Sequence, residues 1–253
     1  MTFTDGSAEA AYDAFASAYD DFTSGYMYER WTGRLLERAE EAGLGGKRLL
    51  DVACGTGWSF LPMLDRGFRV TACDISTQML DVARSKTGGR AKVLVADMRE
   101  LPDLGRFDLV WALNDPLNYL LSTEELEATL SGFRRNLAPA GIAMFDVNTP
   151  VTYRTFFSQE TVVEEAGRRM VWHGQSTADE VRPGSFHEAL LEIEGEEGSG
   201  RIHRQRYFPE AEVLTGIEAA GLRCVEVYGE LEGELSTPLD EQAHSKAVYL
   251  CSV

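Results

Sequence analysis

The sequence predicts a doubly wound α/β fold, in which helices cover both faces of a mostly parallel sheet. Two neighbouring apolar runs carry the prediction. The first, residues 48–53, ends abruptly in the turn Cys54-Gly55-Thr56-Gly57 and is followed by a helix-compatible segment at 58–66. The second, residues 68–73, stops at Asp74. A strand, a glycine turn, a helix and a second strand in this order form the opening of a nucleotide-binding sheet.

The residues around the glycine turn indicate what it binds. Glycines permit a tight turn and let a ligand lie against backbone N–H groups at the start of a helix. Asp74 follows Gly55 by 19 residues, at a strand end where a carboxylate can accept both hydroxyls of a ribose. Phe60 stands where the dinucleotide fingerprint has its third glycine, and Asp51 precedes the turn. A carboxylate there suits a ligand with an amino group better than a pyrophosphate.

The pattern Asp51-x-Ala-Cys-Gly-Thr-Gly, together with Asp74, resembles the S-adenosylmethionine site of class I methyltransferases. The resemblance implies S-adenosylmethionine as the cofactor and methyl transfer as the activity. It also implies a Rossmann-like sheet of seven strands in the order 3-2-1-4-5-7-6, with the last strand antiparallel. The alternative interpretation is a structural strand-to-helix turn that binds no ligand.

Periodicity divides the chain into three parts. Residues 1–44 form a helical cap, because aromatic side chains recur at helical spacing in 8–22 and 28–41. Residues 45–148 and 209–253 form the cofactor-binding core. In 149–208 the helical periodicity gives way to short runs rich in β-branched and aromatic residues, which predict a small antiparallel β insertion that serves as a lid. The remaining core elements are strands at 69–74, 92–96, 107–113, 142–148, 223–231 and 245–253, and helices at 77–86, 123–137 and 209–220.

The resemblance places cofactor contacts at the strand ends and in the cap. Asp97-Met98 is similar to the family's adenine site, with Asp97 accepting from the exocyclic amine and Met98 contributing backbone contact. Tyrosines of the N-terminal helices in such enzymes reach the cofactor or the acceptor, although simple packing is the alternative for each. The candidate cofactor-binding residues are Tyr12, Tyr19, Trp31, Asp51, Ala53, Gly55, Gly57, Asp74, Ile75, Met79, Asp97, Met98 and Asn114.

Candidate catalytic residues lie after the fourth strand and in the insertion. Methyl transfer from a sulfonium requires an aligned acceptor lone pair and, for some acceptors, removal of a proton. Relatives that act on amino sugars can carry a histidine after strand four, where this chain has Tyr119. We therefore take Tyr119, His173 and His187 as candidates, and if Tyr119 has no role, His173, His187 or His203 of the insertion would serve. A structural or solvated role is the alternative for each histidine.

Charge and cysteine content exclude several classes of function. The formal net charge is −17, and acidic side chains outnumber basic ones in both 1–150 and 151–253. Binding to nucleic acid or to anionic membranes is disfavoured, because neutralising phosphates requires clustered Lys and Arg. The four cysteines lack metal-ligand spacing, which predicts reduced thiols and no metal. Without a signal-like N-terminus or a long apolar run, the sequence predicts a cytoplasmic protein.

The function predicted is N- or O-methylation of a small molecule. Tyr12-Asp13-Ala14-Phe15-Ala16-Ser17-Ala18-Tyr19-Asp20 and the loop Asn118-Tyr119-Leu120-Leu121 are similar to segments of sugar and antibiotic N-methyltransferases. Methylation of tRNA or protein is the alternative enzymatic function, and a catalytically silent cofactor-binding protein is the non-enzymatic one. The sequence leaves open whether the chain is a monomer or a homo-oligomer.

Overall fold

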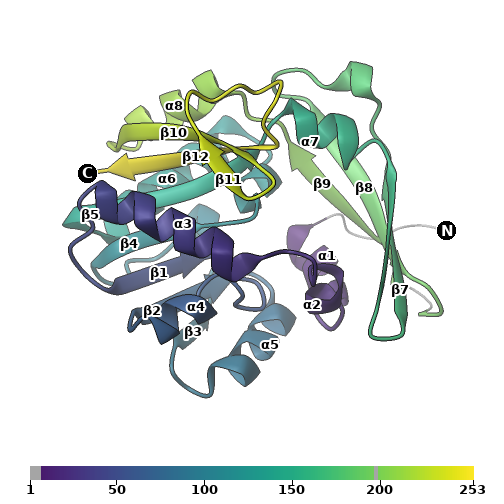
Figure 1. Ribbon diagram of the computed structural model, residues 1–253, viewed down its shortest axis with the longest axis horizontal. Helices are drawn as coiled ribbons and strands as arrows, with labels where there is room; N and C mark the ends of the chain where they lie inside the picture. The colour runs from purple at the N-terminus through teal and green to yellow at the C-terminus, as the bar shows by residue number, and fades with distance from the viewer. Residues whose placement is uncertain (1–6, 197–198) are drawn as a thin grey trace.

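The apolar runs of the core pair into one mixed sheet with the order β11-β10-β12-β5-β4-β1-β2-β3 (Figure 1). The computed structural model describes residues 7–196 and 199–253. Neighbouring strands are parallel along the sheet from β3 through β2, β1 and β4 to β5. Strand β12 is antiparallel to both β5 and β10. The strands are β1 (Arg48–Val52), β2 (Arg69–Asp74), β3 (Lys92–Val95), β4 (Phe107–Ala112), β5 (Leu137–Asn148), β10 (Arg223–Leu231), β11 (Glu234–Ser236) and β12 (Lys246–Ser252). Apart from the short edge strand β11, which the sequence analysis did not anticipate, this confirms the predicted order.

Strand β5 starts earlier than expected. The sequence predicts this strand at 142–148, but β5 begins at Leu137, directly after the helix before it, and includes the Pro139-x-Gly141 passage. The pairing with β4 shifts register between Phe107 and Leu109, so the passage forms an irregularity within the strand. Pro139 is tolerated because a proline without an N–H can occupy a bulge.

Helices cover both faces of the sheet, and two of them begin at serine caps. The Ser76 and Ser122 hydroxyls accept from backbone N–H groups of Met79 at 3.1 Å and Glu125 at 3.2 Å. The core helices are α4 (Leu61–Asp65), α5 (Thr77–Thr87), α6 (Thr123–Asn136) and α8 (Glu210–Ala219), with short 3₁₀ turns η1 (Met98–Glu100) and η2 (Pro116–Tyr119). Helix α4 is shorter than the predicted 58–66, because the glycine turn continues up to Phe60.

Alternation along the strands builds an apolar layer on each face of the sheet. Leu49 packs with residues of α3 (Tyr28–Glu41), α4 and α5, whereas Leu50 packs with residues of α6 and α8. Successive side chains of a strand point to opposite faces, so the two leucines enter different layers. Both layers are continuous, and together they fix the strand ends where ligands bind in such sheets.

The N-terminal segment and the insertion lie together on one side of the core (Figure 1). The predicted helix 8–22 is interrupted and forms α1 (Ala8–Phe15) and α2 (Tyr19–Phe22). A separate antiparallel sheet, as predicted, has the order β6-β7-β8-β9. Its strands are β6 (Glu160–Glu165), β7 (Arg168–Gly174), β8 (Phe186–Ile193) and β9 (Arg201–Arg206). Phe15 of α1 packs in the same apolar cluster as Trp172 and Leu191 of this sheet.

The insertion contains a short helix that the sequence did not predict. Helix α7 (Pro150–Thr155) begins at Thr149, whose hydroxyl accepts from the Val151 N–H at 3.3 Å. Pro150 stands at the first helical position, where its missing N–H costs nothing. A further 3₁₀ turn, η3 (Ala178–Glu180), precedes β8. Within residues 7–196 and 199–253, no helix has the length and apolar character to cross a membrane.

Candidate active site at the strand ends

The loops after β1 and β4 hold unusual backbone conformations. After β1, Ala53, Gly55 and Gly57 have φ values of +57°, +52° and +92°. After β4, Asn114 and Asp115 have φ values of +71° and +56°. Positive φ is uncommon for residues other than glycine and concentrates at binding sites, where surrounding contacts hold the strain. Both loops lie at the carboxyl edge of the parallel strands, where the sequence predicts the ligand site.

Asp74 lies at the end of β2, at the edge of the sheet where the sequence predicts the cofactor; we call this region, from the glycine turn to Ser76, the cofactor edge. Its two carboxylate oxygens accept from the Gly55 N–H at 2.8 Å and the Ser76 N–H at 2.9 Å. Burial raises the pKa of Asp74, while these backbone donors lower it. A Cβ added at Gly55 would meet no atom within 4 Å, so open space lies beside the turn. A carboxylate next to such a space fits the nucleoside half of S-adenosylmethionine, and Asp74 would hold the ribose there.

Gly57 has a different reason to be glycine from the one the sequence indicates. A Cβ at this position would lie 2.8 Å from the ring of Phe60 and 3.5 Å from Ala83. The close approach is therefore to the protein's own core, and a bound ligand is not needed to explain it. Asp51 is likewise fully buried, accepts from the Ser59 hydroxyl at 2.5 Å, and has its pKa raised to about 7 by burial.

The other candidate cofactor residues surround this edge unevenly. Met79 is buried beneath the start of α5, whereas Ala53, Ile75 and Met98 are partly exposed. Burial raises the pKa of Asp97, but its bonds with Arg99 outweigh that effect, so the net shift is downward. An adenine amine that binds Asp97 would therefore meet a carboxylate that already accepts from Arg99.

The cap is fastened to the cofactor loop by two aspartates. Asp13 accepts from the Ser76 hydroxyl at 2.6 Å and from the Gln78 N–H at 3.3 Å. Asp20 accepts from the Thr56 hydroxyl at 2.6 Å and from the Trp58 indole at 2.8 Å. The tyrosine preceding each aspartate, Tyr12 or Tyr19, lines a cavity. The repeated Tyr-Asp pair thus joins the glycine turn to the cavity wall.

That cavity has a volume of about 910 Å³ and is lined by the cap, the strand-end loops and the small sheet. Its lining is strongly aromatic and includes Tyr12, Tyr19, Trp31, Tyr119, Phe156 and Trp172. Trp31 and Asn114, both candidate cofactor residues, also line it. Apolar walls with a few polar groups are typical of small-molecule sites.

Three hydrogen-bonded polar side chains lie in the cavity lining. The Tyr12 hydroxyl donates to the Tyr119 hydroxyl at 3.0 Å, and the Tyr119 oxygen lies 3.0 Å from Nδ1 of His203. His203 is only 2% exposed, and its Nε2 has no hydrogen-bond partner among the residues described. Burial raises the pKa of Tyr119 and lowers that of His203 to about 4. All three groups are therefore neutral near pH 7.

The two histidines proposed as catalytic lie elsewhere. His173 stands on β7 beside Glu160 at 3.1 Å and Glu192 at 3.4 Å. His187 is buried on β8, with its ring nitrogens 2.7 Å from the Ser185 hydroxyl and 3.0 Å from the Ser176 hydroxyl. Neither residue lines the cavity. The structure brings Tyr119 together with His203 instead.

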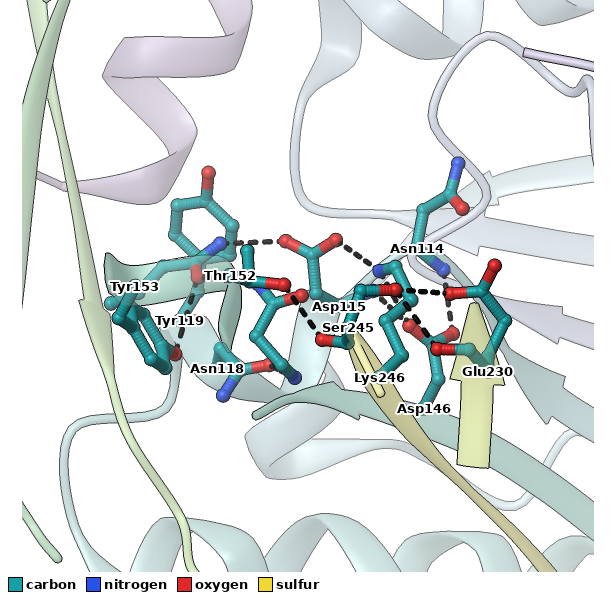
Figure 2. A network of polar contacts seen from close by, with 12 residues as sticks. Asn114, Asp115, Asn118, Tyr119, Asp146, Thr152, Tyr153, Glu230, Ser245 and Lys246 are labelled. Carbon is teal, nitrogen blue, oxygen red and sulfur yellow. Dashed lines mark hydrogen bonds and ion pairs between the residues drawn. The ribbon is translucent and has the colours of Figure 1, made fainter. Parts of the chain in front are cut away.

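A buried ionic cluster forms one wall of the cavity (Figure 2). The Lys246 ammonium lies 2.6 Å from Asp115 and 2.8 Å from Asp146. Burial by itself lowers the pKa of Lys246, but the two carboxylates outweigh it and raise the value. Asp146 also accepts from the backbone N–H groups of Asn114 and Asp115 at 2.8 Å each, which fixes the strained loop after β4.

Sequence reasoning did not select most of this wall. Asp115, Lys246 and Gln205 belong to three separate elements, and only the fold brings them together. A period of two was the one available signal. It places His203 and Gln205 on the buried face of β9.

Known proteins were compared with this chain. A family profile described as "Methyltransferase domain" matches residues 49–141. YqeM of Bacillus subtilis (strain 168), named as a methyltransferase with no substrate in its name, is 30% identical over 93% of this chain and 96% of its own length. Cypemycin N-terminal methyltransferase of a Streptomyces species is 29% identical over 89% of this chain and 92% of its own length. The dTDP-3-amino-3,4,6-trideoxy-alpha-D-glucopyranose N,N-dimethyltransferase of Streptomyces venezuelae is 30% identical over 69% and 75%, respectively.

Solved structures agree on the fold. An S-adenosylmethionine-dependent methyltransferase from Clostridium acetobutylicum has a TM-score of 0.78 at 20% identity, covering 96% of this chain and 98% of its own. The amino pentose methyltransferase CalS10 of Micromonospora echinaspora, solved with S-adenosylmethionine, has a TM-score of 0.71 at 23% identity over 94% and 95%. With the near full-length similarity to YqeM, the chain belongs to the class I S-adenosylmethionine-dependent methyltransferases.

Proposed function

We propose that the enzyme methylates a nitrogen atom of a small-molecule amine. Residues 45–148 and 209–253 would bind the cofactor, residues 1–44 would cap it, and residues 149–208 would cover the acceptor. The observation that carries the proposal is the aromatic cavity whose lining includes the hydrogen-bonded side chains of Tyr12, Tyr119 and His203. It adjoins the cap, whose aspartates bond to the glycine turn and to the start of α5.

The chemistry of the three polar groups favours nitrogen over oxygen. An alcohol has to lose its proton as it attacks, so it benefits from a base whose pKa is near the working pH. With a pKa of about 4, His203 is a weak base at pH 7, and Tyr119 stays protonated because burial raises its pKa. A neutral amine already has a free lone pair and needs orientation above all. The amine's own N–H groups can donate to acceptor atoms of neutral side chains, which orients the lone pair.

Separate groups of residues would bind the cofactor and orient the acceptor. When bound, S-adenosylmethionine supplies an electrophilic methyl group on its sulfonium. Asp74 and the loop at Gly55 would hold the nucleoside half, with Asp97 and Met98 near the adenine. Tyr119 and His203 would hydrogen-bond the acceptor and direct its nitrogen lone pair, while the aromatic walls exclude water. The product's extra proton would leave to solvent after transfer.

The names of two of the relatives support a nitrogen acceptor. Cypemycin N-terminal methyltransferase acts, by its name, on an N-terminus, and the Streptomyces venezuelae relative is an N,N-dimethyltransferase of an amino sugar nucleotide. The first of these gives a second candidate acceptor, the α-amine of a short peptide. An acidic chain with a net charge of −17 disfavours tRNA as the acceptor.

The test is a methylation assay with matched acceptor pairs. The purified enzyme is incubated with S-adenosylmethionine and with amines, amino sugars, short peptides and their hydroxyl analogues, and products are identified by mass spectrometry. We expect methylation of one or more amines and none of the matched alcohols. Methylation confined to alcohols would contradict the nitrogen assignment. Turnover of folded proteins or tRNA, with no small molecule methylated, would contradict the acceptor class.

A further inference from the structure

The cavity wall around Lys246 holds more negative than positive charge. Asp115 and Asp146 both bind the Lys246 ammonium, at 2.6 and 2.8 Å. Glu230 lies directly opposite Lys246 in the pairing of β10 with β12, so both side chains are on one face of the sheet. Three carboxylates and one ammonium therefore belong to this part of the network, and only Asp115 and Asp146 pair with the ammonium (Figure 2).

Glu230 has hydrogen bonds but no cation of its own. The Ser245 hydroxyl donates to one carboxylate oxygen at 2.6 Å, and the Gly233 N–H donates to the other at 2.7 Å. The residue is only 9% exposed, lines the cavity, and forms no ion pair with any residue in 7–196 or 199–253. The other basic residue that lines the cavity, Arg30, is paired with Glu234. A buried carboxylate without a counter-ion is costly unless a ligand supplies one.

Asn148 gives an independent sign of a missing donor on the same wall. It pairs with Lys246 across β5 and β12, on the side opposite Glu230. Its amide N–H group donates to Gln205 at 2.9 Å, but its Oδ1 has no partner in the described part of the chain. The residue is 2% exposed and lines the cavity. An unpaired buried carbonyl oxygen favours a ligand that donates hydrogen bonds.

We propose that this wall is a subsite for a cationic group of the methyl acceptor, with Glu230 as its counter-ion and Asn148 Oδ1 as a hydrogen-bond acceptor. This inference rests on the proposed function and narrows its acceptor class. The nitrogen that receives the methyl group must be neutral to offer a lone pair, so the cationic group is a second one. Tyr119 and Glu230 stand at opposite ends of the network, which separates the two groups (Figure 2).

The experiment measures binding without turnover. Protein saturated with S-adenosylhomocysteine is titrated by calorimetry with 4-phenylbutylamine, a cation at pH 7, and with neutral 4-phenylbutanol. We expect the amine to bind about tenfold or more tightly than the alcohol, the scale of a hydrogen bond to a charged group. Equal affinities, tighter binding of the alcohol, or no binding of the amine would overturn the proposal.

Two variants locate the effect. Glu230→Gln should remove the preference for the amine and leave alcohol affinity unchanged. Glu232→Gln is the matched control, because Glu232 lines the same cavity but is exposed, and it should change amine affinity less than about twofold. A Glu230→Gln protein that keeps the preference would refute the counter-ion role. Unchanged S-adenosylhomocysteine affinity and melting temperature show that the variant is folded. Because this experiment measures binding and not methylation, its result does not depend on the outcome of the methylation assay.

Discussion

The cofactor edge and the proposed acceptor cavity are built in different ways. The edge comes from one continuous stretch, in which Asp74 bonds to Gly55 and Ser76. The cavity takes Tyr12 from α1, His203 from β9 and Lys246 from β12. A local motif therefore identifies the methyl donor, whereas the proposed acceptor cavity depends on contacts that only the complete fold creates. This difference between the two regions explains why the sequence identifies the chain's family but does not identify its acceptor.

The severest test of the locally built edge is Gly57→Val. The residue has a φ of +92°, and a Cβ would lie 2.8 Å from Phe60. Backbone strain and overpacking together should lower the free energy of unfolding by about 2–5 kcal/mol, measured by urea denaturation. Gly55→Ala is the control: its φ is +52° but its Cβ would meet open space, so a loss of about 1–2 kcal/mol is expected. Equal losses would refute the packing role of Gly57.

The two regions should respond to pH in opposite directions. Burial raises the pKa of Asp51 to about 7, so its stabilising contribution is complete below the unfolded value of about 4 and is lost as pH rises to 7. Burial lowers the pKa of His203 to about 4, so stability is complete above about pH 6.5 and is lost as pH falls to 4. At about 1.36 kcal/mol for each pKa unit, the effect amounts to about 4 kcal/mol at most for Asp51 and about 3 kcal/mol at most for His203.

Urea denaturation at pH 4.5 and pH 7 separates the two effects. Relative to the wild type, Asp51→Asn should gain stability as the pH rises, and His203→Gln should gain stability as the pH falls. Asp65→Asn, with a side chain 73% exposed, serves as the control and should follow the wild type at both pH values. The same direction of change in both variants would contradict the buried state of one of the two groups.

Asp74→Ala isolates cofactor recognition from the acceptor cavity. Loss of the carboxylate removes its bonds to the backbone and the expected ribose contacts, so S-adenosylmethionine affinity should fall by about 1.5–3 kcal/mol in calorimetry. Asp81→Ala is the control, because Asp81 is exposed on α5 and pairs only with Arg84 among the ion pairs of the described residues. An unchanged affinity in Asp74→Ala would remove the ribose assignment.

Tyr119→Phe tests the cavity with the smallest change. The variant loses the hydroxyl between Tyr12 and His203. If it orients the acceptor, kcat should fall about three- to tenfold with cofactor affinity unchanged. A loss above about a hundredfold would indicate proton transfer by the phenol instead. Tyr249→Phe is the control, since that buried hydroxyl has no hydrogen-bond partner within the described ranges, and its activity should match the wild type.

Elements of the fold that are defined by a local sequence pattern were predicted well, whereas features that depend on long-range contacts were not. Helix α3 (Tyr28–Glu41) and strands β2 (Arg69–Asp74) and β10 (Arg223–Leu231) have the predicted bounds, because the pattern within one segment defines them. Helix α7 was missed, since it has only one turn and a half and its start depends on Thr149. The glycine turn and Asp74 were recognisable because their spacing is sequential. His203 could not be preferred over His187, because both lie on buried faces of strands and only tertiary contacts differ.

The paired aspartates of the cap have a kinetic consequence. Asp13 and Asp20 bond to the residues around the cofactor site, while Tyr12 and Tyr19 on the same helices form the acceptor cavity wall. If the cap moves to admit the donor, the same movement takes Tyr12 and Tyr19 out of the wall of the proposed acceptor cavity. We expect compulsory-order kinetics, with the donor entering first and its demethylated product leaving last. Initial-rate measurements should then find that product competitive with the donor and noncompetitive with the acceptor.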